Sequence, residues 1–231
     1  MPLAIFDLDN TLLAGDSDYG WGRFLVEQGV VDGEIYEREN QRFYEDYQAG
    51  RLDILEYLTF SLEPLRRLEP ATLTRLRERF LDEVVRPMIT RASRQLLDRH
   101  RQRGDILLII TATNDFITAP IARELGVEHL IATLAEQREG RYTGHVAGTP
   151  CFQEGKVERL LAWLRQTGNN LAGSTFYSDS HNDLPLLELV TQPVAVDPDP
   201  TLADHAAALD WPEISLRGEA IRWIRGDWGP D

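Results

Sequence analysis

Two acids near the N-terminus, Asp7 and Asp9, have the spacing that paired carboxylates need to work together. Residues 3–8 form a short apolar run interrupted by Asp7 and followed by Asp9-Asn10-Thr11, which predicts a strand that ends in a polar turn. Side chains at i and i+2 of an extended segment point the same way, so both acids face one pocket. Their repulsion is relieved by a divalent cation, or by a proton that one acid keeps for acid–base work. The alternative interpretation is a polar turn in which Thr11 caps a helix.

A second polar group follows the aliphatic run 106–110, which predicts another strand. The run is followed by Thr111, whose hydroxyl can donate a hydrogen bond to an anion. A Ser, Thr or Asn before a helix is also typical of an N-cap. We assign the capping role to Thr113 or Asn114, which leaves Thr111 as the candidate ligand.

Lys156 and two further acids complete the set of candidate residues. Lys156 lies at the start of the predicted helix 154–166, where a cation opposes the helix dipole unless a negative group is near. Asp179 and Asp183 follow the predicted strand 174–177, so Asp179 can ligate a metal and Asp183 can orient Lys156 or a metal-bound water. The alternatives are a solvated lysine and an acidic first helical turn.

Strand and helix patterns alternate from residue 90 onward, and the strands are aliphatic throughout, which is typical of a parallel sheet covered on both faces. Residues 16–85 instead show helical spacing, divided by Gly and Pro into about four helices. We predict a doubly wound, Rossmann-like α/β core from residues 1–14 and 87–231, with an inserted helical-bundle cap at 15–86. Ligands in such sheets bind beyond the carboxyl ends of the strands, where all the candidate residues fall.

Three smaller segments carry expectations of their own. Residues 137–146 predict a hairpin, and the three Trp within 211–231 predict a packed terminal helix. His181 is expected to be a loop residue that faces the substrate, because the five His show no metal-binding spacing.

Composition limits the classes of partner. The 231 residues contain 24 Lys+Arg and 38 Asp+Glu, a net charge of −14, which repels nucleic acid and anionic membranes. The single Cys151 forms no internal disulfide, no signal-peptide region precedes Asp7 and no apolar run is long enough to span a membrane, so we expect a cytoplasmic protein, monomer or homodimer. An anionic substrate would need a locally positive pocket, supplied by a metal, a lysine or backbone amides.

Taken in order, these residues resemble the four motifs of the haloacid dehalogenase superfamily of phosphatases: Asp7-x-Asp9-x-Thr11, Thr111, Lys156 and Asp179-x-x-x-Asp183. The resemblance covers essentially the whole chain. The inserted helices look like those of the phosphoserine-phosphatase-like branch, and residues 6–18 are most similar to its histidinol-phosphate phosphatases and hydrolases of unassigned substrate.

The resemblance implies an Mg²⁺-dependent phosphomonoester hydrolase. Asp7 would form an aspartyl-phosphate, and Asp9 would protonate the leaving alkoxide and then activate water. The implied metal ligands are Asp7, the Asp9 carbonyl and Asp179, with Asp183 behind them. Lys156 and Thr111 would act on the transferring oxygens. The implied substrate contacts are Asp16, Thr111, Ala112, Lys156 and Asn182.

The expected substrate is a small phosphorylated metabolite. Asp16 matches an acid that binds the substrate ammonium in phosphoserine phosphatases, whereas Ser61 aligns with their carboxylate-binding arginine, with Arg66 and Arg67 close by. An unpaired carboxylate is costly to bury, so an amino-alcohol phosphate without one, such as histidinol phosphate, is the favoured hypothesis.

Other functions stay open at this point. They are a phosphoserine phosphatase, another small-metabolite phosphatase or phosphotransferase, and a phosphoaspartate signalling domain; the length, the inserted cap and Asp9 argue against the last. Tyr19, Trp21 and Phe24 either stack on an imidazole or pack the core of the cap.

Overall fold

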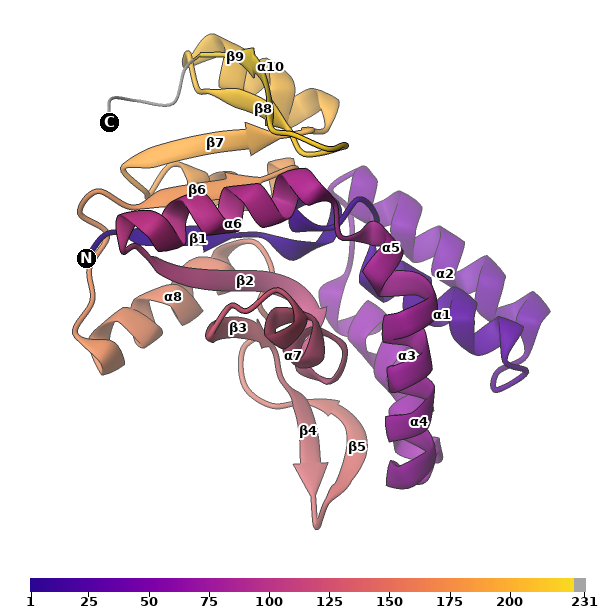
Figure 1. The fold of residues 1–231 in the computed structure, drawn as a ribbon. Helices are drawn as coiled ribbons and strands as arrows, with labels where there is room; N and C mark the ends of the chain where they lie inside the picture. Colours follow the sequence, from indigo (N-terminus) through magenta and orange to yellow (C-terminus); the bar gives the residue numbers. More distant parts are fainter. Residues whose placement is uncertain (227–231) are drawn as a thin grey trace.

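The structure, a computed structural model, describes residues 1–226 and has a seven-stranded sheet at its centre (Figure 1). All neighbouring strands are parallel except the last two, which pair antiparallel. The α/β fold class predicted from the alternating pattern is confirmed. In spatial order the strands are β3 (His129–Thr133), β2 (Ile106–Asn114), β1 (Leu3–Phe6), β6 (Thr175–Ser178), β7 (Gln192–Val196), β8 (Glu213–Ser215) and β9 (Arg222–Arg225).

The central strand β1 is buried on both faces, because successive side chains point to opposite sides of the sheet. Ala4 and Phe6 pack into one apolar core, Leu3 and Ile5 into the other. The first core is covered by α6 (Arg91–Arg103) and α7 (Asp115–Glu124), the second by α8 (Glu154–Thr167), α9 (Leu184–Leu187) and α10 (Pro200–Ala208). This two-sided burial explains why the strands are aliphatic without alternation.

A group of helices is inserted between β1 and β2 and lies beyond the carboxyl ends of the strands (Figure 1). Asp16, Asp32 and Asp53 begin the first three, because their carboxylates accept backbone N–H groups of the first turn. The inserted helical bundle is therefore confirmed, while its boundaries at 15 and 86 stay a prediction. The elements are α1 (Ser17–Glu27), α2 (Gly33–Gln48), α3 (Ile54–Arg67), α4 (Pro70–Phe80), an irregular turn (Leu81–Val85) and α5 (Arg86–Met88).

The strand predicted at 106–110 is longer than expected. β2 continues to Asn114, with an irregularity in its pairing to β3 after Thr111. The β-branched Thr111 and Thr113 fit an extended backbone, and Asn114 caps α7 by accepting the N–H of Ile117 at 3.3 Å. Thr111 therefore lies inside the strand and not after it.

The predicted terminal helix at 211–231 is wrong. In its described part, residues 211–226, the chain instead forms β8 and β9 at the edge of the sheet, with Trp223 packed on the core. Trp228 lies outside the described residues. These strands have only three and four residues, too few for a periodic pattern to reveal.

The hairpin predicted near 137–146 is confirmed as β4 (Ala135–Arg138) and β5 (Arg141–Val146), which pair antiparallel. Within residues 1–226, no helix is long and apolar enough to cross a membrane.

Candidate active site

The carboxyl ends of β1 and β6 bring two of the predicted acids together. Asp7 directly follows β1 and donates its N–H to the Tyr177 carbonyl of β6 at 2.9 Å, while Asp179 directly follows β6. The Thr11 hydroxyl lies 3.0 Å from Asp179 Oδ1 and 3.4 Å from Asp7 Oδ2. Thr11 therefore links the two strand ends and does not cap a helix.

Lys156 neutralises part of the negative charge of these acids. Its Nζ lies 2.7 Å from Asp7 Oδ1 and 2.8 Å from Asp183 Oδ2, and all three side chains are buried. Burial alone would lower the pKa of Lys156, but the carboxylates of Asp183 and Asp7 raise it above its ordinary value, so the lysine is cationic. Asp183 also accepts the Ser178 hydroxyl at 2.7 Å, which fixes its orientation toward the lysine.

Asp7 stays hard to ionise despite the lysine. Burial is the largest influence and, although Lys156 opposes it, the pKa of Asp7 is raised to about 7. A further cation beside this carboxylate would favour the ionised form that a nucleophile needs at neutral pH.

A divalent cation fits this need. Burial and then the charge of Asp7 raise the pKa of Asp179 well above its ordinary value, so the two acids repel each other across Thr11. Carboxylate oxygens are the ligands that Mg²⁺ prefers. No group of three His, Cys, Asp or Glu side chains forms a complete metal site within residues 1–226, so a third protein ligand must be another group, such as the predicted Asp9 carbonyl.

Asp9 lies two residues after Asp7, and its carboxylate accepts two hydrogen bonds. The Ser17 N–H lies 2.6 Å from its Oδ1 and the Thr113 hydroxyl 2.8 Å from its Oδ2. Burial and the charge of Asp16 outweigh these hydrogen bonds and raise the pKa of Asp9 to about 6. A carboxyl group with this pKa can carry a proton and release it near neutral pH. Thr113 was expected only as a possible cap, and its contact with Asp9 depends on the extension of β2.

The remaining predicted residues occupy different positions around the pocket. Thr111, Ala112 and Asn182 all line it. The Thr111 hydroxyl oxygen accepts the Thr113 N–H at 3.2 Å, which leaves its proton free to be donated. The Asn182 amide group donates to the Tyr47 carbonyl of α2 at 3.3 Å, so this residue also joins the core to the inserted helices.

His181 does not line the pocket, contrary to expectation. Its Nδ1 lies 2.7 Å from Asp199 Oδ2, and its ring lies against Gly50 in the turn between α2 and α3. A β-carbon at Gly50 would come within 2.8 Å of His181 Nε2, so glycine is required for this close approach.

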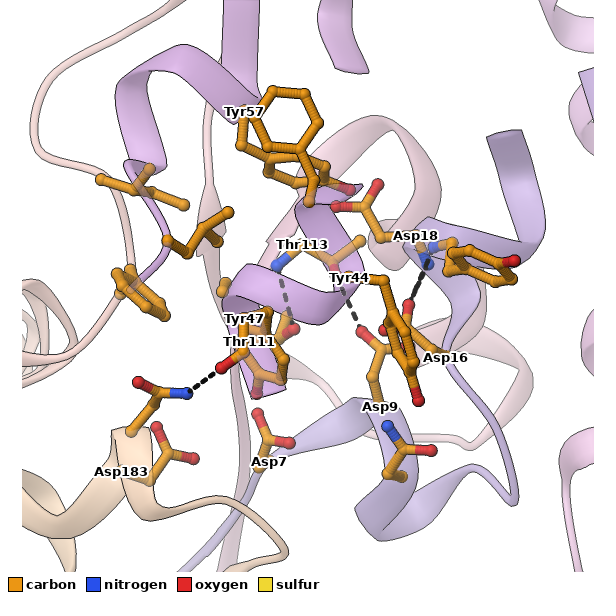
Figure 2. A pocket seen from close by; sticks show the side chains of 18 of the residues that line it. Asp7, Asp9, Asp16, Asp18, Tyr44, Tyr47, Tyr57, Thr111, Thr113 and Asp183 are labelled. Atoms are coloured by element: carbon orange, nitrogen blue, oxygen red, sulfur yellow. Dashed lines mark hydrogen bonds between the residues drawn. The ribbon is translucent and has the colours of Figure 1, made fainter. Parts of the chain in front are cut away.

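The inserted helices form the opposite wall of the pocket, which Figure 2 shows from close by. Asp16 lines it while also capping α1 through its Oδ1, which accepts the N–H groups of Asp18 and Tyr19 at 2.9 Å each. Several aromatic side chains and Asp18 join it there, and sequence analysis had singled out only Tyr19 of this group. These wall residues are Asp18, Tyr19, Phe43, Tyr44, Tyr47 and Tyr57. Phe152, from the segment before α8, also lines the pocket.

The two roles left open for the α1 aromatics are now separated. Trp21 and Phe24 are almost fully buried and pack against Phe80 at centroid distances of 5.2 and 5.6 Å, so they belong to the core. Tyr19 lines the pocket and lies 5.1 Å from the ring of Tyr44.

The structure gives a different argument against a carboxylate on the substrate from the one based on the alignment at Ser61. Ser61 is buried in α3 and does not line the pocket, and Arg66 and Arg67 both pair with Glu63 on the surface. Among the described residues that line the pocket, Lys156 is the only basic one. A carboxylate on the substrate therefore lacks an arginine partner whatever the alignment at Ser61.

The family is established by sequence as well as by geometry. Residues 4–188 match the model of the haloacid dehalogenase-like hydrolases, and the chain belongs to this family. It is 45% identical to a histidinol-phosphatase of Neisseria meningitidis over 93% of this chain and 99% of the relative. It is 33% identical to a phosphoserine phosphatase of Mycobacterium tuberculosis over 90% of this chain and 68% of the relative. Family and relatives identify the chain as a phosphoric monoester hydrolase, as the sequence predicted.

Solved structures support the same fold. A protein of unknown function from Bordetella pertussis superposes with a TM-score of 0.88 at 46% identity, covering 93% of this chain and 98% of the other. A substrate-bound phosphoserine phosphatase superposes with a TM-score of 0.70 at 19% identity, covering 95% of this chain and 94% of the other, a likeness of fold alone.

Proposed function

We propose that the protein is an Mg²⁺-dependent phosphatase that works through an aspartyl-phosphate and acts on a small amino-alcohol phosphate, histidinol phosphate being the favoured substrate. The observation that carries the chemistry is the buried chain Asp7–Lys156–Asp183, with contacts of 2.7 and 2.8 Å, beside the protonatable Asp9. The side chains come from the ends of separate strands and the start of α8, as a site beyond a parallel sheet requires.

Asp7 is the proposed nucleophile. Its Oδ1 accepts the 2.7 Å hydrogen bond of Lys156, so Oδ2, which has only the longer 3.4 Å contact with Thr11, is the oxygen that attacks phosphorus in line and displaces the substrate alkoxide. Mg²⁺ bound by Asp7, Asp179 and the Asp9 carbonyl would offset the charge of the phosphate and of the acids. Lys156 and the Thr111 hydroxyl act on the transferring oxygens, since both groups line the pocket and can donate hydrogen bonds.

Asp9 is the proposed general acid and base. Its pKa of about 6 lets it give a proton to the leaving alkoxide and then take one from the water that hydrolyses the aspartyl-phosphate. Thr113 and the Ser17 N–H hold the carboxyl group in one orientation for both steps.

The proposed substrate follows from the pocket and from one relative. The pocket contains acids and aromatic rings facing the leaving group and a single lysine committed to Asp7 and Asp183. An amine cation matches this wall, whereas the carboxylate of phosphoserine does not. The 45% identical relative is a histidinol-phosphatase, which has a substrate of this kind.

The test is phosphate release with Mg²⁺ from histidinol phosphate, phosphoserine, phosphoethanolamine, a sugar phosphate and a nucleotide. We expect histidinol phosphate to have the highest kcat/KM, with Asp7→Asn inactive on every ester. A higher kcat/KM for phosphoserine would refute the substrate, and an active Asp7→Asn would refute the nucleophile.

A further inference from the structure

Asp18 is a buried acid that the chemistry above does not use. Its side chain is in the first turn of α1, is only 9% exposed and lines the pocket. Its Oδ1 is buried and accepts no hydrogen bond from any residue within 1–226. A buried acceptor without a donor destabilises the folded protein. A pocket wall that retains such an oxygen indicates a ligand that supplies the missing donor.

Asp16 and Asp18 differ in what they are free to bind. Asp16 is committed to α1, because its Oδ1 accepts two backbone N–H groups at 2.9 Å. Asp18 makes no such contact with the backbone, and its side chain is instead oriented by a hydrogen bond with the Tyr57 hydroxyl. Figure 2 shows Asp18 and Tyr57 facing each other at the end of the pocket away from Asp7. Asp18 is therefore the acid whose carboxylate takes no part in capping α1.

The surroundings of Asp18 favour a cation. The titratable groups that face it are Asp9, Asp16, Tyr36 and Tyr57, none of them basic. Aromatic rings line the same wall, where Phe43 and Tyr57 pack edge to face with centroids 5.2 Å apart. The faces of aromatic rings attract cations. Burial raises the pKa of Asp18 to about 7, and a bound cation would favour its ionised form.

We propose that Asp18, oriented by Tyr57, is the residue that binds the cationic group of the substrate alcohol, an ammonium or a protonated imidazole, while the phosphate lies at Asp7. The inference rests on the proposed phosphatase function and adds the residue that selects the substrate. It assigns selection to Asp18 and not to Asp16, the acid expected from the family resemblance.

The experiment compares two esters of equal length, 3-aminopropyl phosphate and butyl phosphate. The first ends in an ammonium group and the second in a methyl group. Asp18→Asn keeps the shape of the side chain and an oxygen for Tyr57 but removes the charge. We expect the ratio of kcat/KM for the amine ester to that for the butyl ester to fall about 30-fold. Asp16→Asn is the matched variant, because asparagine also caps helices, and it should change the ratio less. Glu34→Gln, an exposed acid of α2, is the surface control.

Each outcome decides the matter. An equal loss on both esters in Asp18→Asn, or a larger loss of selectivity in Asp16→Asn, would overturn the assignment. Calorimetric titration of histidinol into the enzyme measures binding of the cation without chemistry, and its Kd should rise at least tenfold in Asp18→Asn. If no ester is hydrolysed yet histidinol binding depends on Asp18, the phosphatase proposal fails and the cation site stands; unchanged histidinol binding refutes the cation site itself.

Discussion

Replacing Thr113 by Val tests whether Asp9 acts as an acid held in place by its neighbours. The substitution keeps the shape of a side chain that is 4% exposed and removes one hydroxyl, which lies 2.8 Å from Asp9 Oδ2. A hydrogen bond to a charged group contributes about 1.5–3 kcal/mol. The Ser17 N–H still holds the other oxygen at 2.6 Å, so we expect the lost hydrogen bond to raise the activation free energy by about 2 kcal/mol. This increase corresponds to a rate loss of about 30-fold.

The assay compares two leaving groups. An alkyl phosphate such as 3-aminopropyl phosphate needs a proton on its departing alkoxide, whereas p-nitrophenyl phosphate releases a stable phenolate without one. We expect Thr113→Val to lose about 30-fold in kcat/KM on the alkyl ester, and no more than about threefold on the aryl ester. Thr113→Ser retains the hydroxyl and should recover most of the alkyl activity.

Two results would refute this reasoning. Equal losses on both esters would mean that Thr113 supports the site generally and does not orient an acid. A Thr113→Ser enzyme as slow as Thr113→Val would mean that the methyl group matters and the hydrogen bond does not. Thermal melts of both variants exclude a loss of folded protein as the cause.

Two further predictions concern stability and the loop after β1. In EDTA, Tm should fall by about 5 °C from pH 5 to pH 8. The pKa values of Asp7 and Asp18 are raised to about 7, so the folded state binds more protons than the unfolded state over this range. The folded state therefore loses stability as the pH rises through 7. Mg²⁺ should raise Tm more at pH 8 than at pH 5, and a flat EDTA profile would contradict this. Arg217 donates to two carbonyls of the loop carrying Asp9, at 2.5 and 2.9 Å. Arg217→Ala should lower kcat about tenfold, Arg217→Lys less, and unchanged kcat in both would count against a positioning role.

The cluster proposed to bind phosphate could be predicted from sequence, as a set of residues that lie together, because each residue is tied to a local pattern. Asp7, Lys156 and Asp179 each stand beside a strand or helix end that aliphatic runs make recognisable, and parallel topology brings those ends to one edge. No knowledge of tertiary contacts was needed to bring them together. The same reasoning succeeded for the fold class, since buried parallel strands have a distinctive composition.

Residues whose role depends on contacts between distant segments could not be found this way. Thr113 meets Asp9 across 104 positions of the chain, and only because β2 runs past the residue where its aliphatic pattern stops. The aromatics show the same limit: Trp21 in the core and Tyr57 at the pocket have similar helical spacing, and only the packing of helices decides which ring faces a cavity. Asp18 resembles any acid in a first helical turn until its unpartnered oxygen is seen.

The two ends of the pocket differ in how well they should tolerate amino-acid substitutions. At the end near Asp7, Lys156 lies between Asp7 and Asp183, so replacing the lysine leaves two buried carboxylates without their cation and should cost several kcal/mol as well as activity. At the other end, Asp18 and the aromatic side chains of α2 and α3 each face the pocket on helices that other residues hold together. Single substitutions there can alter which alcohol is accepted while leaving the reaction in place. If the proposed function holds, we expect substitutions in the inserted helices to change substrate choice, and substitutions at the edge of the sheet to abolish the reaction.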